Sequence, residues 1–363
     1  MRRRRRCARA GGEPARVRAS AEAWLRAWWA GEGEAAGRAL SAAALPAELA
    51  FRAAVALRRS AYDRGLLPAH RAAVPVICVG NLTVGGTGKT PLAGWVAGTL
   101  AVAGARPMLV LRGYGRDEAL LHRRWRPEIP VVACADRVHA VRRAAAAGAS
   151  VVVLDDGYQH RRLARDLDLV VVSADQLFPG RMLPRGPYRE PVEAIERASW
   201  VVVTRKRASA EQAQLVEDAV RRAAPAARLA RAVFSPAGWT ALDGGPAAAP
   251  GGAVLAVAGI ADPPSFAALV RGRTTGPVEL LAFADHHNYT AADVERIRRV
   301  AQGRTIAVTE KDAVKLSALA AALPDVRVLE LRVEMETGEA ALRTALLHVA
   351  GASAPVPNGK GTP

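Results

Sequence analysis

The sequence predicts an α/β protein in which a mostly parallel β-sheet carries helices on both faces, with a smaller second α/β lobe. Three observations predict this fold class. Short apolar runs recur along the chain, alanine-rich and charged stretches of helical length separate them, and a glycine-rich loop follows the first apolar run after residue 75. Strands buried on both faces are continuously apolar, and helices between them connect parallel strands.

Composition limits the classes of protein that fit. The chain has 363 residues, of which 50% are hydrophobic, so it can form about two domains with sizeable cores. Its formal net charge is +17. Such a surplus favours a polyanionic partner, namely nucleic acid, anionic lipid or a phosphorylated substrate. A genome that favours arginine and alanine codons would also produce it.

The first 70 residues divide into an Arg- and Ala-rich extension (1–39) and an amphipathic segment (40–70). Apolar residues alternate with charges in the second part: Leu45, Leu49, Phe51 and Val55. Because Glu48 and Arg52 interrupt it, this segment is too polar to span a bilayer. It can lie in the membrane interface or pack as an ordinary helix on the domain.

The cellular compartment follows from the cysteines and the N-terminus. The three cysteines have neither metal-binding spacing nor a disulfide pattern, which indicates a reducing compartment. The arginines at positions 2–6 are not followed by the apolar core of a signal peptide. We therefore expect a cytoplasmic protein whose membrane contact, if any, is at the surface.

The larger lobe is expected over residues 71–228. Its strands are predicted at 76–79, 108–111, 131–133, 151–154, 169–172 and 200–203. Its helices are predicted at 90–103, 135–147 and 208–223.

The smaller lobe is expected over residues 229–350. Glycines and prolines between 238 and 252 predict turns and a linker at its start. Strands are predicted at 254–257, 279–283, 305–309 and 326–331, and helices at 264–271, 291–301 and 313–322. Residues 351–363 are expected to form a flexible tail.

The glycine-rich loop predicts a phosphate-binding site. A strand ends at Gly80, and a helix begins near Thr90. Amide N–H groups of such a loop converge on phosphate oxygens, a lysine neutralises the β- and γ-phosphates, and a hydroxyl binds Mg²⁺. The predicted nucleotide-binding residues are Thr83, Val84, Gly85, Gly86, Thr87, Gly88, Lys89 and Thr90. Thr83 stands where the usual pattern has glycine. The larger lobe is therefore expected to resemble the P-loop NTPases.

Paired acids supply the carboxylate that a nucleotide-bound metal needs. The apolar run 151–154 ends in Asp155 and Asp156, the arrangement that places a carboxylate beside Mg²⁺ in P-loop enzymes. We expect Thr90, Asp155 and Asp156 at the metal. The stretch from Thr309 to Asp312 lacks the spacing of a guanine-reading motif. ATP is therefore favoured over GTP.

Taken together, the motifs resemble the tetraacyldisaccharide 4′-kinase family of lipid A biosynthesis. The block Asp155-Asp156-Gly157-Tyr158-Gln159-His160 carries the most specific likeness. The other matching stretches are 75–91, 112–115, 161–166, 183–190, 285–287 and 308–315. Two departures stand out, since the insertion that follows Arg-Gly-Tyr-Gly in relatives is missing after Gly115, and Arg185 replaces an alanine.

This resemblance implies two α/β lobes with the active site between them, and the transfer of the ATP γ-phosphate to the 4′-hydroxyl of a tetraacyl glucosamine disaccharide 1-phosphate, giving lipid IVA. It implies Asp117 as the catalytic base, His286 as its partner and Lys89 at the phosphates. The implied substrate residues are Asn81, Arg112, Tyr114, Gln159 and His160. It also implies ATP and Mg²⁺ as cofactors, and peripheral or monotopic docking of the N-terminal segment on the cytoplasmic face of the anionic inner membrane.

Two other functions stay open at this point. Positive charge alone also fits a regulatory NTPase that binds nucleic acid, but only 5% of residues are aromatic and no nucleic-acid motif is visible, so we expect no nucleic-acid partner. A P-loop kinase of another anionic small molecule would need no membrane segment. The sequence does not indicate an oligomeric state.

Overall fold

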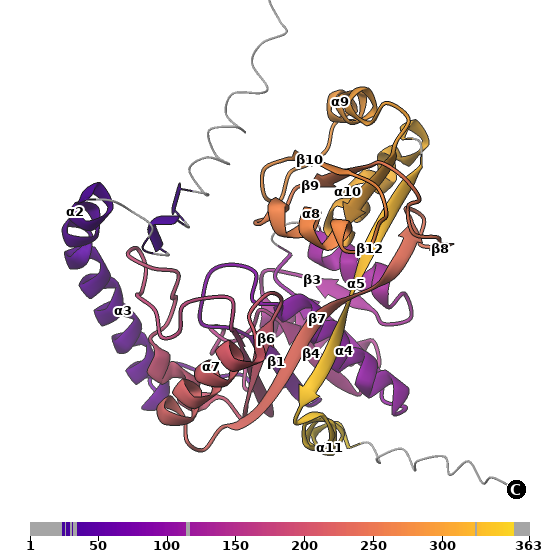
Figure 1. Cartoon of the computed structure of the whole chain (residues 1–363). Helices are drawn as coiled ribbons and strands as arrows, with labels where there is room; N and C mark the ends of the chain where they lie inside the picture. The colour runs from indigo at the N-terminus through magenta and orange to yellow at the C-terminus, as the bar shows by residue number, and fades with distance from the viewer. Residues whose placement is uncertain are drawn as a thin grey trace, which may run out of the picture. The chain divides into compact units, whose positions relative to one another are not determined.

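The structure, a computed structural model, describes residues 24–25, 27–29, 31, 35–113, 117–323 and 325–351 (Figure 1). It forms two compact units. The larger unit comprises Ala44–Ser235 and the residues from Arg332 onward, and the smaller unit comprises Pro236–Leu331 and the described residues up to Ala43. The chain passes from one unit to the other within strands β7 (Arg228–Ala241) and β12 (Val326–Thr337).

A parallel sheet forms the centre of the larger unit, in the order β7-β6-β5-β1-β4-β2-β3. Besides β7, its strands are β1 (Val76–Gly80), β2 (Pro107–Leu111), β3 (Val131–Ala133), β4 (Val151–Asp155), β5 (Leu167–Ser173) and β6 (Trp200–Arg205). Strand β1 lies between β5 and β4, with Val76 opposite Val152 and Ile77 opposite Leu167. The six predicted strands are all present.

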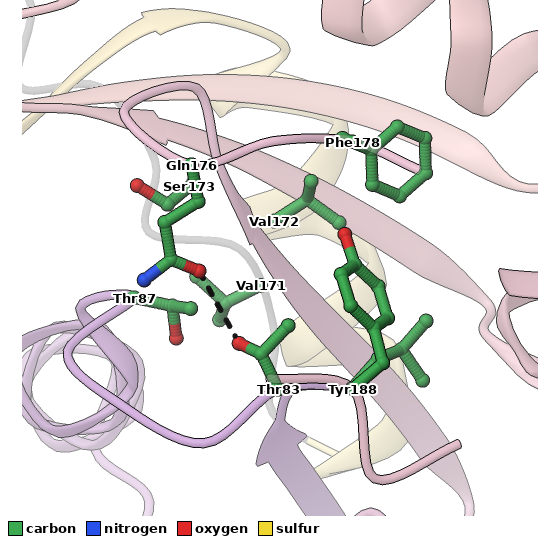
Figure 2. Close-up of a pocket in the computed structure, with 9 residues that line it drawn as sticks. Thr83, Thr87, Val171, Val172, Ser173, Gln176, Phe178 and Tyr188 are labelled. Atoms are coloured by element: carbon green, nitrogen blue, oxygen red, sulfur yellow. Dashed lines mark hydrogen bonds between the residues drawn. The ribbon is translucent and has the colours of Figure 1, made fainter. Parts of the chain in front are cut away.

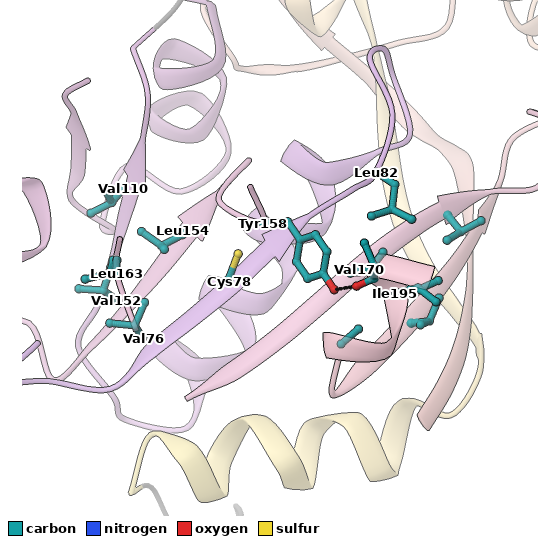
Figure 3. Close-up of a cluster of buried hydrophobic side chains, with 14 of the residues drawn as sticks. Val76, Cys78, Leu82, Val110, Val152, Leu154, Tyr158, Leu163, Val170 and Ile195 are labelled. Carbon is teal, nitrogen blue, oxygen red and sulfur yellow. Dashed lines mark hydrogen bonds between the residues drawn. The ribbon is translucent and has the colours of Figure 1, made fainter. Parts of the chain in front are cut away.

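Helices cover both faces of this sheet, as the sequence predicts. They are α3 (Leu45–Asp63), α4 (Lys89–Val102), α5 (Asp117–Trp125), α6 (Arg137–Ala146), α7 (Ala210–Ala223) and α11 (Glu339–Val349), with a 3₁₀ helix at Val192–Arg197. One core contains α6 and α7 side chains packed on Cys78 and Leu154. Figure 3 shows the strand side of this core, with Tyr158 beside Cys78. The other contains α4 and α11 side chains packed on Ile77 and Val153. Residues on one strand alternate between these two cores, which is why the strands are apolar throughout.

Helix α3 differs from the single apolar face that the sequence suggests. Phe51 and Val55 pack against the core of the larger unit, whereas Leu45, Leu49 and Leu57 are exposed. The helix also makes polar contacts with the rest of the larger unit. Glu48 is buried, and its carboxylate accepts hydrogen bonds from the Met182 amide at 3.0 Å and from Arg185 at 2.8 Å. The substituted Arg185 thus anchors α3.

No single helix among the described residues has the length and hydropathy to cross a bilayer. Helix α2 (Ala35–Ala43) and helix α3 meet the length and composition requirement only when they are taken together as a bent pair.

The smaller unit has a parallel sheet in the order β10-β9-β11-β12. Besides β12, its strands are β9 (Val254–Ala258), β10 (Val278–Ala282) and β11 (Thr305–Thr309), and its helices are α8 (Pro263–Arg271), α9 (Ala291–Ala301) and α10 (Glu310–Leu316) with a 3₁₀ helix at Ser317–Ala322. Side chains of α9 and α10 pack on one face and those of α8 on the other.

Three expectations for the C-terminal half need correction. The predicted linker is largely ordered, since residues up to Ala241 continue β7 and pair with the short strand β8 (Pro246–Ala247). Strand β12 extends to Thr337, and helix α11 was not predicted. The two compact units also do not coincide with the predicted lobes at 71–228 and 229–350. Leu342 and Leu346 of α11 join the core around Leu92, so this helix belongs to the larger unit.

Candidate active site

Glycines give the phosphate loop its backbone path. Gly88 has a φ of +94° immediately before α4, and a Cβ at this position would lie 2.2 Å from a ring carbon of Phe234. A Cβ at Gly80 would lie 2.6 Å from that of Tyr158, so the loop after β4 can approach β1 only because Gly80 is a glycine. The tip of the loop, residues 84–86, is exposed, as an anion site at a helix N-terminus requires.

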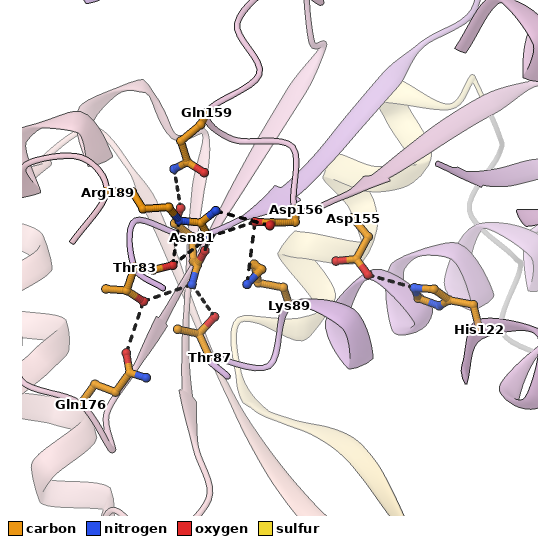
Figure 4. Close-up of polar contacts among 10 residues, drawn as sticks. All are labelled: Asn81, Thr83, Thr87, Lys89, His122, Asp155, Asp156, Gln159, Gln176 and Arg189. Atoms are coloured by element: carbon orange, nitrogen blue, oxygen red, sulfur yellow. Dashed lines mark hydrogen bonds and ion pairs between the residues drawn. The ribbon is translucent and has the colours of Figure 1, made fainter. Parts of the chain in front are cut away.

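Asn81 holds the loop together from inside (Figure 4). It is fully buried, and its amide nitrogen donates hydrogen bonds to the hydroxyls of Thr83 at 3.1 Å and Thr87 at 3.0 Å. Its side-chain oxygen accepts a hydrogen bond from Arg189 at 2.7 Å. The polar atoms of Asn81 are thus engaged in shaping the loop, and its contact with substrate stays a prediction.

Arg189 connects the two halves of the site, a role that the sequence did not indicate. One guanidinium nitrogen donates to the Thr83 carbonyl at 2.7 Å, and the same group pairs with the Asp156 carboxylate at 3.2 Å. The Arg189 amide also donates to the Leu82 carbonyl at 2.7 Å. Arg189 thereby fixes the loop after β1 to Asp156, directly after β4.

Lys89 and Asp156 form the charged centre of the site. The Lys89 ammonium lies 3.8 Å from the Asp156 carboxylate. Burial alone would raise the pKa of Asp156, but Lys89 and Arg189 outweigh burial and hold this pKa below its usual range. The backbone of Asp156 has a φ of +56°, which is uncommon for a residue with a side chain and is typical of functional sites.

Asp155 points away from this centre, toward helix α5 (Figure 4). Its carboxylate lies 3.0 Å from Nε2 of His122, and its other oxygen, Oδ1, is buried without a hydrogen-bond partner among the described residues. Mg²⁺ prefers oxygen ligands such as carboxylates and hydroxyls. The orphaned oxygen of Asp155 and the hydroxyl of Thr90, in the first turn of α4, are donors of this kind. The residues therefore fit a divalent cation.

A small cavity lies beside the loop (Figure 2). Its lining includes Thr83 and Gln176, whose side chains form a hydrogen bond of 3.3 Å. Val172, Phe178 and Tyr188 supply apolar walls. The Thr204 hydroxyl donates to the Thr87 carbonyl at 2.7 Å, which holds the loop on its other side. Thr83 thus anchors the loop at the position where glycine is usual.

The other predicted substrate residues surround the same strand ends. Gln159 donates to the Asn81 carbonyl at 2.7 Å, and Arg112 is exposed beyond β2. Burial, with Arg137 and Arg162 nearby, lowers the pKa of His160 to about 4, so its imidazole is uncharged at neutral pH. Tyr114 lies outside the described residues.

Asp117 and His286 are in different units. Asp117 is buried in the first turn of α5 in the larger unit, followed by Glu118. His286 is exposed in the smaller unit and has a φ of +56°. Its amide donates to Asp285 at 3.0 Å. The hydroxyl of Tyr289, three residues later, donates to the buried Asp312 at 2.8 Å, which anchors the loop that carries His286.

The structure therefore brings six of the predicted residues to one place: Asn81, Thr83, Thr87, Lys89, Asp156 and Gln159. Reasoning from the sequence missed His122, Arg137, Gln176 and Arg189. Only Arg189 lies within a stretch that resembles the kinase family. Arg137 is buried, and its Nε has no hydrogen-bond partner among the described residues.

Comparison with known proteins identifies relatives. The sequence model of the family described as tetraacyldisaccharide-1-P 4′-kinase matches residues 40–121 and 116–350. A tetraacyldisaccharide 4′-kinase of Anaeromyxobacter sp. (strain K) is 40% identical over an alignment of 370 residues, which covers 91% of this chain and 96% of the relative. One of Xanthomonas euvesicatoria pv. vesicatoria is 40% identical over 297 residues, with 75% and 83% covered.

The fold also has a solved counterpart. The crystal structure of LpxK from Aquifex aeolicus in complex with ATP superposes with a TM-score of 0.67 at 23% sequence identity, covering 85% of this chain and 99% of that one. At this identity the likeness concerns the fold alone.

Proposed function

The chain belongs to the tetraacyldisaccharide-1-phosphate 4′-kinase family, and from this membership we infer that it is a kinase of lipid A biosynthesis. It transfers the γ-phosphate of ATP to the 4′-hydroxyl of a tetraacyl glucosamine disaccharide 1-phosphate, and the product is lipid IVA. The observation that carries this inference is the phosphate loop, where Lys89 pairs with Asp156 and Arg189 joins the Thr83 carbonyl to the same carboxylate.

We propose the following roles for the residues of the larger unit. The exposed loop tip at Gly85 and Gly86 and the Lys89 ammonium bind the β- and γ-phosphates. Thr90 and Asp155 supply oxygen ligands to Mg²⁺, which when bound neutralises charge on the phosphates. Asp156 holds Lys89 in position through their ion pair. Arg112, Gln159 and His160 line the acceptor side.

The acceptor hydroxyl needs a base. We propose that Asp117 takes the proton of the 4′-hydroxyl while that oxygen bonds to the γ-phosphorus and ADP leaves, and that His286 orients Asp117. A positioned base is worth about 10²–10⁴ in rate.

An assay with labelled ATP tests the function directly. We expect the chain to transfer labelled phosphate to the tetraacyl disaccharide 1-phosphate. The label should remain after a treatment that removes only the phosphate at the anomeric carbon, because the new phosphate is at the 4′-position. The deacylated disaccharide 1-phosphate and single-stranded DNA serve as the two comparisons. Equal labelling of the deacylated acceptor would favour a kinase of a soluble anionic sugar. ATP hydrolysis that only DNA stimulates would favour a regulatory NTPase.

We further propose that the enzyme docks on the cytoplasmic face of the inner membrane through α3. Three large side chains of this helix, Leu45, Leu49 and Leu57, are exposed on the larger unit, and Arg52 and Arg58 accompany them. Isolated exposed leucines are common, but three on one helix with basic neighbours suit an anionic interface.

Replacing these three leucines by serine tests the docking. Because each CH₂ group buried in the bilayer contributes about 0.8 kcal/mol, we expect binding to anionic vesicles to weaken at least about tenfold. Co-sedimentation with phosphatidylglycerol vesicles measures this. Leu215→Ser, which removes an equally exposed leucine from α7, should bind like the unchanged protein. Equal binding of the triple variant would contradict the proposal.

A further inference from the structure

Helix α5 carries a buried histidine that the function above does not use. His122 and Asp155 each have only 1% of their side chain exposed, and Nε2 of His122 lies 3.0 Å from Oδ2 of Asp155 (Figure 4). An ionised carboxylate only accepts hydrogen bonds, so the imidazole donates. The pair joins α5 to the end of β4, beside the phosphate loop.

The surroundings of His122 hold its ring in one orientation. The ring packs edge-on against Trp125 of the same helix, with centroids 5.6 Å apart and planes at 85°. On the other side it faces α4, where a Cβ at Gly94 would lie 3.6 Å from Nδ1. Nδ1 itself has no hydrogen-bond partner among the described residues. Among the described residues, the imidazole therefore hydrogen-bonds to Asp155 alone, and a side chain of similar volume could occupy the site without this bond.

This contact determines which oxygen of Asp155 is available. Oδ2 is held by His122, whereas Oδ1 is buried and has no partner in the described part of the chain. Asp156 is less suited to a cation, because Arg189 contacts both of its oxygens and Lys89 lies beside it. Of these two acids, Asp155 is therefore the one that keeps a carboxylate oxygen, Oδ1, without a partner among the described residues.

We propose that His122 is a positioning residue which fixes the Asp155 carboxylate so that Oδ1 binds the divalent cation of the metal–nucleotide complex. The proposal rests on the kinase function inferred above. Replacing a residue that hydrogen-bonds to the non-coordinating atom of a metal ligand typically changes the metal affinity by about 10–100-fold. Because Asp117 lies on the same helix, His122 also ties the helix of the proposed base to the strand end of the metal carboxylate.

Direct cation binding tests the proposal without relying on turnover. Mn²⁺ binding to the full chain, in the presence of a non-hydrolysable ATP analogue, is measured by electron paramagnetic resonance. We expect His122→Leu to raise the Kd for Mn²⁺ by about 10–100-fold. His122→Gln, whose amide N–H can reach Asp155, should bind Mn²⁺ nearly normally. His139→Leu removes an exposed histidine of α6 and should change nothing.

Two further comparisons separate positioning from folding. In the Asp155→Asn background, His122→Leu should cause no further loss of Mn²⁺ affinity, because the residue acts through that carboxylate. If His122→Leu fails to fold, His122→Asn replaces it, since this shorter amide is polar but cannot reach Asp155. Equal Mn²⁺ affinity of the Asn and Gln variants, or normal affinity of a folded Leu variant, would overturn the proposal. Failure of the unchanged chain to phosphorylate the disaccharide would instead refute the kinase function.

Discussion

Lys89→Ala is expected to lower kcat by about 10³-fold or more. Removing one preorganised hydrogen-bond donor that faces the developing charge typically lowers kcat by about 10²–10³-fold. A full ammonium charge at the transferred phosphate contributes more than a single N–H donor does. The structure shows how the ammonium is held ready. It lies 3.8 Å from Asp156, and its side chain is only 13% exposed. The initial rate of disaccharide phosphorylation at saturating ATP and Mg²⁺ measures the effect.

The loss should reflect chemistry rather than unfolding. Asp156 retains its contacts with Arg189 in the Lys89→Ala variant, so its carboxylate does not become an unpaired buried charge. We therefore expect thermal unfolding close to that of the unchanged chain. Arg298→Ala, which removes an exposed cation from α9, is the matched control and should keep full activity. Near-normal kcat in the Lys89 variant would refute the assignment of the phosphate loop.

Sequence reasoning succeeded where the signal is local. A run such as 76–79 followed by Gly80 and by Lys89-Thr90 specifies a strand, a turn and a helix start within fifteen residues, and the structure confirms all three. The buried strands of the central sheet were predictable for the same reason. Their apolar runs reflect burial on both faces, a property that each strand carries in its own residues.

It failed where the determinant is a partner distant in sequence. Arg189 reaches Asn81 across 108 positions, and Glu48 of α3 meets Arg185 across 137. Neither residue has a local pattern that reveals its contact. Helix α11 was missed because its fit against α4 depends on leucines that meet only in the fold. The last part of strand β7 was mistaken for a linker because it contains Pro236 and Gly238, residue types that usually interrupt strands.

Asp117→Ala and His286→Ala are each expected to lower kcat by about 10²–10⁴, the usual worth of a positioned general base. A secondary alcohol is a poor nucleophile, so proton removal as the new bond to phosphorus forms is a large part of the barrier. Because neither residue belongs to the phosphate loop, the KM for ATP should change little. Steady-state kinetics with each substrate varied in turn measures both constants.

The double variant tests whether Asp117 and His286 act as one unit. Residues that share one catalytic task are strongly non-additive, so Asp117→Ala with His286→Ala should be scarcely slower than the slower single variant. Asp218→Ala on α7 and His139→Ala on α6 remove a half-buried acid and an exposed histidine, and both controls should keep normal kcat. The backbone of His286 adds a specific check. Its φ of +56° favours glycine, so His286→Gly should relieve strain and leave folding intact while activity is still lost. Losses that multiply in the double variant, or a mild loss at Asp117, would show that another residue takes the proton.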